Sequence, residues 1–457
     1  MSSSGEPSIA GSIVRPGDTD WDSARSSWNL AADQQPVAVA LVQSAEDVAQ
    51  VVRHAAANGL RVTAQGTGHG AAALGALGAL EDTILIKTER MRGIQIDPDT
   101  RIARVQAGVL SLELGEAAQA HGLCTLPGSA TDVGAIGFSL GGGLGWLGRR
   151  YGFACNRVRA IELVTAEGEL RTVDAEHDGD LFWALLGGGG SYAIVTALRT
   201  ELVPLAEVYA GTLIFPAELG AEAIRGYRDW AAGVGEEVSS VVRFLRPPPL
   251  PDVPEPLRGR ALLTIGVTCI GSQEQGEATV APLRALGEPI MDMVGWMPTA
   301  GLSRINMDPE QPTPGIGHHA LIDELPDEAI DAFVGAAGPE AGSSLLLAEM
   351  RQLGGAFARE AEGGGALSKL EGAFLLNGIG VPMGPATPEA IGADLDRLYD
   401  AIGPWRREGQ YFNFAERPCD VDAILPPEVC ERLREVKRRW DPDGVLRANH
   451  ELAAAAA

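Results

Sequence analysis

Three glycine-rich stretches separate short apolar segments in the first part of this 457-residue chain. The first follows the β-like segment 61–65 and carries His69 at its tip, the second spans 128–145, and the third is the run Gly187–Gly190. Glycine lets backbone N–H groups come close to a phosphate, whereas flexible linkers are usually serine-rich and lie between domains. The pattern therefore indicates an extended, phosphate-bearing ligand, beside which an imidazole can act as ligand, base or covalent tether.

Charge and cysteine usage exclude several classes of partner. The chain has 36 basic and 61 acidic residues and a net charge of −25. Its field repels phosphate backbones and anionic lipid, so neither nucleic acid nor a membrane is expected as a partner. The five cysteines are widely spaced and suit neither a disulfide framework nor a metal site. Without the pattern of a secretion signal or a membrane span, we expect a cytoplasmic protein with reduced thiols.

The predicted elements up to residue 204 follow the pattern of an α/β domain. Residues 1–35 are polar and irregular, and 128–145 is so rich in glycine that a wrapping loop is expected there. Strands are expected at 36–42, 61–65, 83–86, 101–105, 158–165 and 192–195, with helices at 44–59, 112–122 and 180–185.

From about residue 205 onward, strands alternate with helices rich in alanine and acidic residues. This predicts a second lobe built as a sheet backed by helices, in which the proline-rich segment 247–251 is a stiff surface connection. Strands are expected at 208–215, 239–245, 261–270, 318–322, 345–351 and 373–381, and helices at 217–232, 274–286 and 327–336. A last helix is expected from Pro427, with an apolar stripe at Val429, Leu433, Val436 and Trp440.

Two short motifs leave a nicotinamide-dinucleotide site open as an alternative. Residues 66–71 match G-x-G-x-x-A after a strand, with Glu89 about 20 residues further on, and residues 143–148 match G-x-G-x-x-G. The first motif is not followed by a clean amphipathic helix, because Gly75 and Gly78 interrupt it, and the second is not preceded by a clean strand. An NAD(P)-dependent dehydrogenase is therefore a second hypothesis.

A longer set of motifs, in a fixed order, covers residues 29–204 and 405–452. The motifs are Gln65–Gly70, Val133–Gly134, Leu140–Trp146, Arg149–Gly152, Val164–Gly168, Asp180–Leu185, Ile194–Thr196, Tyr411–Phe414 and Trp440–Asn449. Together they resemble the FAD-binding domain of the vanillyl-alcohol oxidase and p-cresol methylhydroxylase (PCMH-type) superfamily. Within it, the set is most similar to the berberine-bridge-enzyme-like branch of oxidases.

The resemblance implies a two-lobed α/β (α+β) fold with FAD laid across the first lobe. It divides the chain into a PCMH-type FAD-binding domain at 29–204, a substrate-binding domain at 205–404 with a mainly antiparallel sheet backed by helices, and a C-terminal segment at 405–452 that returns to the first domain. It also implies that His69 is bonded to the flavin 8α-methyl carbon. The cofactor-binding positions that it implies are His69, Gln65, Gly66, Thr67, Gly68, Gly70, Val133, Gly134, Gly137, Ser139, Gly142, Gly143, Gly145, Ile194, Val195, Tyr411, Asn413 and Asn449.

Comparison with the family pattern refines these expectations. Many members carry a second tether, a cysteine, where this chain has Ala130, which implies a single covalent link. Val133 stands at the place associated with oxygen access to the flavin, which favours an oxidase. Phe414 replaces the second tyrosine of the family's Tyr-x-Asn-Tyr stretch. Cys124 and Cys155 are interpreted as buried structural thiols.

Several residues are candidates for the catalytic base. Tyr411 is the phenol left in the Tyr-x-Asn-Tyr stretch, with a packed aromatic ring as the alternative. On the strand that holds Glu349 and Gln352, a period of two puts them on opposite faces, so the face that looks at the flavin decides which one reaches substrate. A structural salt bridge is the alternative for Glu349. His318 and His319 could also line the cavity, with a surface or structural role as the alternative.

The expected function is that of an FAD-dependent oxidase. A base takes the proton from a substrate hydroxyl or amine, the adjacent carbon delivers a hydride to flavin N5, and O2 reoxidises the flavin to give H2O2. The expected partners are O2 and a small molecule, namely a sugar, an oligosaccharide or a secondary metabolite, and the chain is expected to be a monomer or a homodimer. A non-catalytic flavin-binding protein, made plausible by Phe414, is the remaining alternative.

Overall fold

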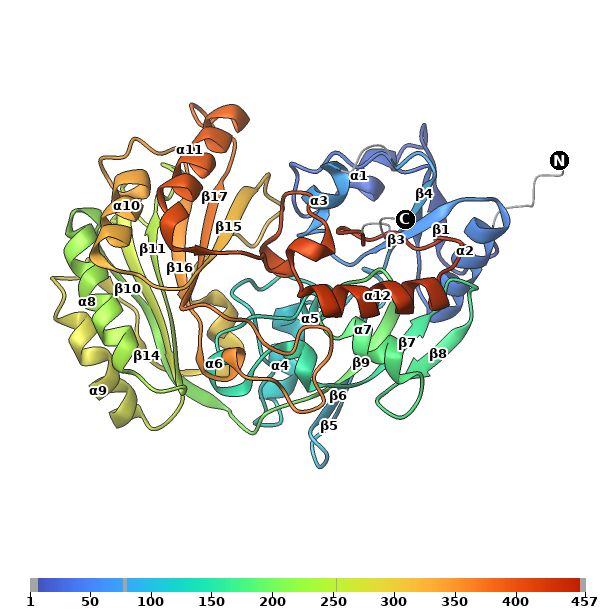
Figure 1. Cartoon of the computed structure of the whole chain (residues 1–457), viewed down its shortest axis with the longest axis horizontal. Coiled ribbons are helices and arrows are strands. Elements are labelled where there is room, and N and C mark those ends of the chain that lie inside the picture. The colour runs from blue at the N-terminus through green and yellow to red at the C-terminus, as the bar shows by residue number, and fades with distance from the viewer. Residues whose placement is uncertain (1–6, 77–79, 252, 453–457) are drawn as a thin grey trace.

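The computed structural model describes residues 7–76, 80–251 and 253–452. Two lobes lie side by side, and the chain crosses from the first to the second once before its C-terminal part returns (Figure 1). Within the described residues the first lobe holds two sheets and the second lobe one larger sheet. The expected mixture of helices and antiparallel sheets is confirmed.

The first sheet has the order β1-β2-β4-β3, with β2, β4 and β3 parallel. Its strands are β1 (Ser12–Val14), β2 (Ala38–Leu41), β3 (Arg61–Gln65) and β4 (Thr83–Lys87). Helix α2 (Ala45–Ala57) packs on it and begins as predicted, because the Ser44 hydroxyl accepts the Asp47 amide at 3.1 Å. Strand β3 ends at Gln65, directly before the first glycine-rich turn.

The second sheet of the first lobe is antiparallel, with the order β5-β6-β9-β7-β8. Its strands are β5 (Ile94–Asp97), β6 (Ile102–Gln106), β7 (Val158–Val164), β8 (Leu170–Val173) and β9 (Ile194–Glu201). The other helices of this lobe are α1 (Trp21–Arg25), α3 (Ala71–Ala76), α4 (Ser111–Gln119), α5 (Ala135–Leu140), α6 (Gly148–Tyr151) and α7 (Gly179–Leu185).

Two expectations for this lobe are wrong. Residues 1–35 are not irregular throughout, because β1 pairs with the edge of β2 and Ala24 of α1 packs against Val39 and Leu85. Residues 128–145 are not all loop, because α5 buries Ala135 and Ile136 in the core of the lobe. In both places a few apolar residues gain burial against distant strands, which outweighs the polar or glycine-rich local sequence.

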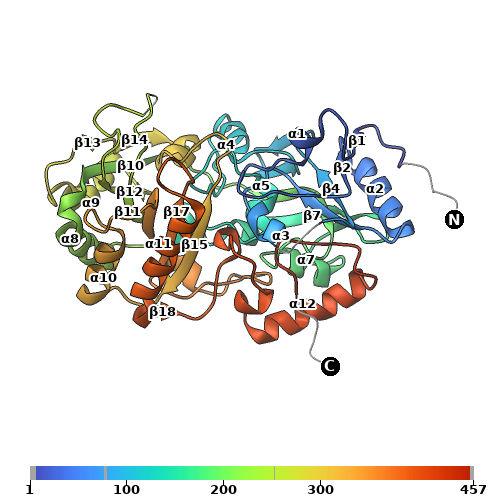
Figure 2. The same ribbon diagram turned by 90° about the horizontal axis from the view of Figure 1, so that it is seen from above.

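The second lobe is one antiparallel sheet with the order β13-β10-β12-β11-β16-β17-β15-β18, and β14 also pairs with β10. Its strands are β10 (Glu207–Pro216), β11 (Val238–Leu245), β12 (Leu262–Cys269), β13 (Met291–Asp292), β14 (Gly295–Pro298), β15 (Ile316–Ile322), β16 (Leu347–Gln352), β17 (Phe374–Gly380) and β18 (Arg406–Arg407). Helices α8 (Gly220–Gly233), α9 (Gln273–Arg284), α10 (Asp327–Ala337) and α11 (Pro388–Ala401) cover the outer face of this sheet (Figures 1 and 2). The strands and helices predicted here are confirmed, whereas α11 and the short strands β13, β14 and β18 were not predicted.

The C-terminal part of the chain packs on the first lobe. Helix α12 (Pro427–Trp440) begins at the predicted proline and buries Leu433 and Val436 in that lobe's core. The backbones of Val62 and 445–447 then exchange two hydrogen bonds of 2.8 Å. Strand β18 lies just after residue 405 but still belongs to the sheet of the second lobe. The division at 29–204, 205–404 and 405–452 remains a prediction.

All five cysteines are unpaired within the described residues. Cys124 and Cys155 are buried as predicted, and burial raises the pKa of each thiol to about 12. None of the helices in the described part of the chain combines the length and the apolarity needed to span a membrane.

Asp441 fastens the C-terminal segment, and its removal is expected to weaken the fold. Its buried carboxylate accepts the Val445 and Leu446 amides at 2.7 and 2.9 Å and pairs with Lys437. Replacing Asp441 with alanine leaves these donors without their acceptor, so we expect the free energy of unfolding to fall by about 1–3 kcal/mol. Denaturant unfolding measures this fall. The exposed Asp443→Ala variant is the control, and an equal effect of both variants would contradict the role of Asp441.

Candidate active site

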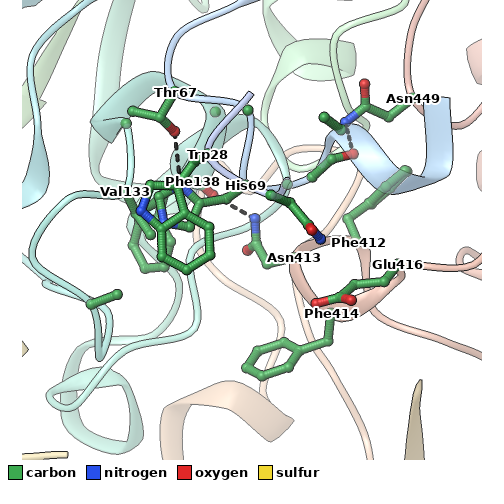
Figure 3. Close-up of a pocket in the computed structure, with 18 of the residues that line it drawn as sticks. Trp28, Thr67, His69, Val133, Phe138, Phe412, Asn413, Phe414, Glu416 and Asn449 are labelled. Atoms are coloured by element: carbon green, nitrogen blue, oxygen red, sulfur yellow. Dashed lines mark hydrogen bonds between the residues drawn. The ribbon is translucent and has the colours of Figure 1, made fainter. Parts of the chain in front are cut away.

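A cavity of about 440 Å³ is lined by residues of both lobes. Its wall is built from 63–71 at the end of β3 and in the turn that follows, the 128–144 stretch, 189–195 at the start of β9, the facing sides of β16 and β17, and the C-terminal segments 412–416 and 447–450. Figure 3 shows part of this cavity, with Trp28, His69, Phe138 and Asn413 among the residues that line it.

The first glycine-rich turn brings His69 to the cavity. Gly68 has a φ of +90°, and a Cβ there would lie 2.4 Å from Gln65 Nε2, so only glycine fits this turn. Asn449 in the C-terminal segment donates to the Gly70 carbonyl at 2.6 Å. The turn is therefore fixed by β3 on one side and by the returning C-terminal segment on the other.

Three side chains surround the His69 imidazole. Nδ1 lies 2.8 Å from the Thr67 hydroxyl, Nε2 lies 3.3 Å from Asp132 Oδ1, and the ring stacks on Trp28 with centroids 4.0 Å apart. Burial pushes the pKa of Asp132 up, but hydrogen bonds to His69 and Trp28 outweigh it and hold the pKa below its ordinary value. Neither Trp28 nor Asp132 belongs to a motif, so the sequence does not point to them.

The residues around the cavity fit FAD. A Cβ on Gly137 or Gly190 would meet nothing within 4 Å, so these glycines leave open the space that a ligand lying against the backbone needs. Apolar side chains of Ile136, Leu144 and Val195 also line the cavity. The predicted cofactor positions that line it are Gln65, Gly66, Thr67, Gly68, His69, Gly70, Val133, Gly134, Gly137, Val195, Asn413 and Asn449.

The structure does not bring the other predicted cofactor positions to the cavity. These are Ser139, Gly142, Gly143, Gly145, Ile194 and Tyr411. The glycines among them allow two stretches of chain to approach each other: a Cβ at Gly145 would lie 2.1 Å from the Pro127 carbonyl, and the Gly143 amide donates to Asn413 at 2.9 Å. These glycines therefore lie behind the residues that line the cavity and allow the chain segments of its wall to pack closely.

Tyr411 is packed in the interior. Its hydroxyl donates to Asn413 Oδ1 at 2.9 Å, its backbone amide donates to His319 Nε2 at 2.8 Å, and its ring lies 6.0 Å from that of Phe153. Burial also raises the pKa of this phenol well above its ordinary value. This placement corresponds to the packed-aromatic alternative, and it is Phe414 that lines the cavity.

Strand β16 shows the predicted alternation. Leu347, Glu349 and Arg351 line the cavity, whereas Gln352 faces α8, where it accepts from the Ser240 hydroxyl at 2.9 Å and donates to a backbone carbonyl of α8 at 2.8 Å. Gln352 is therefore satisfied on the face away from the cavity. His319 is equally occupied by Tyr411, and neither His318 nor His319 is among the residues that line the cavity.

Glu349 is a buried carboxylate paired with two arginines. Its oxygens lie 2.7 Å from Arg351 Nε and 2.8 Å from Arg243 Nη2, and Arg243 also contacts Asp308 at 3.0 Å. Burial pushes the pKa of Glu349 up, but the two guanidinium groups outweigh it and keep the pKa below its ordinary value. An anion held this firmly is a poor proton acceptor, and its evident role is to fix Arg351.

Arg351 presents part of its guanidinium to the cavity. Besides Glu349 it contacts Ser129 Oγ at 3.1 Å and lies 5.2 Å from the centre of the Phe414 ring. Within the described residues its Nη1 has no hydrogen-bond partner. This N–H group is therefore available to an oxygen acceptor of a bound molecule.

Glu416 is a cavity carboxyl that the sequence motifs do not single out. It lies against Gly317, where a Cβ would be only 2.8 Å from Oε2, and Oε2 is shielded from solvent without a hydrogen-bond partner in the described chain. Burial raises its pKa to about 7, against a smaller opposing effect of a hydrogen bond with the Gly317 backbone. Among the described carboxylates that line the cavity, Glu416 is the one without a cationic partner. Its only signal in the sequence is its place two residues after Phe414.

Known proteins with similar sequences are consistent with an FAD site in this cavity. Residues 36–174 match the family model described as an FAD binding domain. The (R)-6-hydroxynicotine oxidase of Paenarthrobacter nicotinovorans is 27% identical over 97% of both chains. The xylooligosaccharide oxidase of Thermothelomyces thermophilus is 33% identical over 40% of this chain and 36% of its own length.

A solved structure agrees in fold. The wild-type BBE-like 1 protein of Physcomitrella patens superposes with a TM-score of 0.82 over 98% of both chains at 18% identity. The recognition from the sequence motifs is thereby confirmed: this chain is an FAD-linked oxidoreductase with an FAD binding domain at residues 36–174, and its fold is that of the BBE-like protein.

Proposed function

We propose that this chain is an oxidase that removes a hydride from a carbon bearing a hydroxyl or amine group and passes the electrons to O2. The observation that carries the proposal is the continuity of one cavity from His69 to the β16 and Glu416 side chains. Because relatives are named as oxidases of 6-hydroxynicotine and of xylooligosaccharides, the proposed substrate is a sugar, an oligosaccharide or a secondary metabolite.

The proposed cofactor is FAD held by a single covalent bond to His69. The glycine backbone at 66–70 would hold the pyrophosphate, and Ala130, where a second tether would otherwise stand, lines the cavity without a nucleophile. When bound, the flavin ring accepts a hydride from substrate and returns two electrons to O2. Val133 at the cavity wall supports access for O2.

Side chains of the second lobe and of the C-terminal segment would handle the substrate. Glu416 is placed to take a proton at its carboxylate from the substrate hydroxyl or ammonium group. Arg351 Nη1 would orient a substrate oxygen, and Phe414 would cover the site and keep water out. Glu349, which the sequence offers as a candidate base, acts in this scheme by holding Arg351 in place.

The setting of the reaction is also a proposal. The unpaired cysteines of the described chain support a reducing compartment and hence the cytoplasm. We propose that the protein works there as a monomer or a homodimer with no macromolecular partner.

Anaerobic reduction tests the function. The purified protein is mixed without oxygen with panels of sugars, alcohols and amines, and the flavin absorbance is followed. A substrate should bleach the yellow colour, and admission of air should restore it with one H2O2 per substrate oxidised. A colourless protein that needs added NAD(P) would overturn the proposal. Bleaching without formation of H2O2 would show that the protein is a dehydrogenase and not an oxidase.

A further inference from the structure

Asp132 is positioned by backbone contacts on both sides. The carbonyls of its neighbours Thr131 and Val133 accept the Leu112 and Ser111 amides at 2.9 Å each, so the loop is fixed at the start of α4. The carboxylate then faces Trp28 Nε1 with Oδ2 and His69 Nε2 with Oδ1. Trp28 is itself held, because its backbone amide donates to the Thr67 carbonyl at 2.9 Å.

This arrangement selects one tautomer of His69. Nε2 and Asp132 Oδ1 lie 3.3 Å apart, both are shut off from solvent, and within the described residues neither makes a hydrogen bond with any other group. A carboxylate without a proton can only accept, so the imidazole proton belongs on Nε2. Nδ1 then carries the lone pair and accepts from the Thr67 hydroxyl at 2.8 Å, and an unprotonated nitrogen is the form of imidazole that acts as a nucleophile.

We propose that Asp132 is a positioning residue for the covalent attachment of FAD: by holding the proton on Nε2 and the ring against Trp28, it keeps Nδ1 of His69 ready to form the bond. The inference rests on the proposed histidyl link. It assigns Asp132 a role in forming the cofactor bond, separate from substrate oxidation.

The proposed step balances in atoms and electrons. A bond forms between Nδ1 and the 8α carbon of the flavin, and one C–H bond of that methyl group is lost. The flavin ring would take up the two electrons and the proton of that bond, and O2 would then accept both electrons, this proton and one proton from solvent to leave as H2O2. Nε2 keeps its proton throughout, and the growing positive charge on the imidazole is stabilised by the adjacent Asp132 carboxylate.

Two substitutions separate this role from simple packing. In Asp132→Asn, the Trp28 N–H should hold the amide oxygen, which turns the NH2 group toward Nε2. Nε2 must then accept, so the proton moves to Nδ1 and the attacking lone pair is lost. In Asp132→Ala neither tautomer is favoured. A purely structural role makes alanine the worse substitution, whereas the tautomer role makes asparagine the worse one.

The test measures flavin that stays with protein precipitated by acid, beside the total flavin bound before precipitation. Wild type, Asp132→Asn, Asp132→Ala and the exposed control Asp99→Asn are purified, supplied with FAD, and followed with time. We expect all four to bind FAD, and the rate of covalent incorporation to fall about 10–100-fold in Asp132→Asn, less in Asp132→Ala, and not at all in the control.

Three outcomes would overturn the inference. Incorporation in Asp132→Asn at the wild-type rate removes the role of Asp132 while leaving the histidyl link intact. If covalent incorporation is slower in Asp132→Ala than in Asp132→Asn at equal bound flavin, Asp132 acts by packing and not by selecting the tautomer. Wild type without any acid-stable flavin rejects the link itself, and with it the proposed cofactor chemistry at His69.

Discussion

The Glu416→Gln variant is expected to lose about 10²–10⁴-fold in kcat/KM for an alcohol substrate at pH 8, because the cavity then lacks its proton acceptor. In the wild type kcat/KM should rise with pH through about 7, where burial has placed the pKa of Glu416, and level off above it. The glutamine variant should lack this rise. The histidines that follow Gly317 on β15 do not interfere, since burial lowers the pKa of His318 and His319 to about 4 and 3.

Stability separates loss of the base from loss of the fold. A carboxyl whose folded pKa is raised favours the folded state when protonated, and this contribution is lost as the pH rises through about 7. Glutamine should therefore cost no stability at pH 8. The exposed Glu408→Gln variant is the kinetic control. A glutamine variant at position 416 whose kcat/KM with an alcohol still rises through pH 7 would remove Glu416 from the mechanism.

The Arg243→Met variant is expected to lose about 3–5 kcal/mol in the free energy of unfolding at pH 7, because it removes one of the two cations of the buried Glu349 carboxylate and the cation of Asp308. Arg243 is almost completely buried and contacts both Glu349 and Asp308. The loss should shrink below about pH 5, where unpaired carboxyls take up protons.

Denaturant unfolding at both pH values measures this effect. The matched control is Arg304→Met, which breaks an exposed pair with Glu310 at 2.9 Å and should cost less than about 1 kcal/mol. If both variants lose the same small amount, the ion pair between Arg243 of β11 and Glu349 of β16 does not stabilise the fold. Loss of Arg351 alignment should also appear as a raised KM.

Local patterns predicted those parts of the fold that depend on neighbouring residues. The Ser44 cap, the alternation along β16 and the Pro427 start of α12 follow from spacing alone, and the structure has them. Helix α5 and strand β1 depend instead on apolar contacts with distant strands, which a glycine-rich or polar stretch does not reveal.

The same distinction applies to the site. The place of His69 at the cavity could be predicted, because a glycine-rich turn after a strand is a local motif. Glu416 and Asp132 could not, because their surroundings come from Gly317, Trp28 and other residues far away in sequence. Whether Tyr411 faced the cavity was decided by the contacts of its amide and hydroxyl, which no local pattern encodes.

The absorption spectrum before and after acid precipitation, with wild type beside His69→Ala, tests the central claim most directly. A histidyl FAD should leave the wild-type pellet yellow, whereas the variant should bind flavin that washes out completely. Colour that washes out of both proteins would reject the covalent link and keep the flavin. A colourless wild type that cannot take up FAD would contradict the account of the whole cavity.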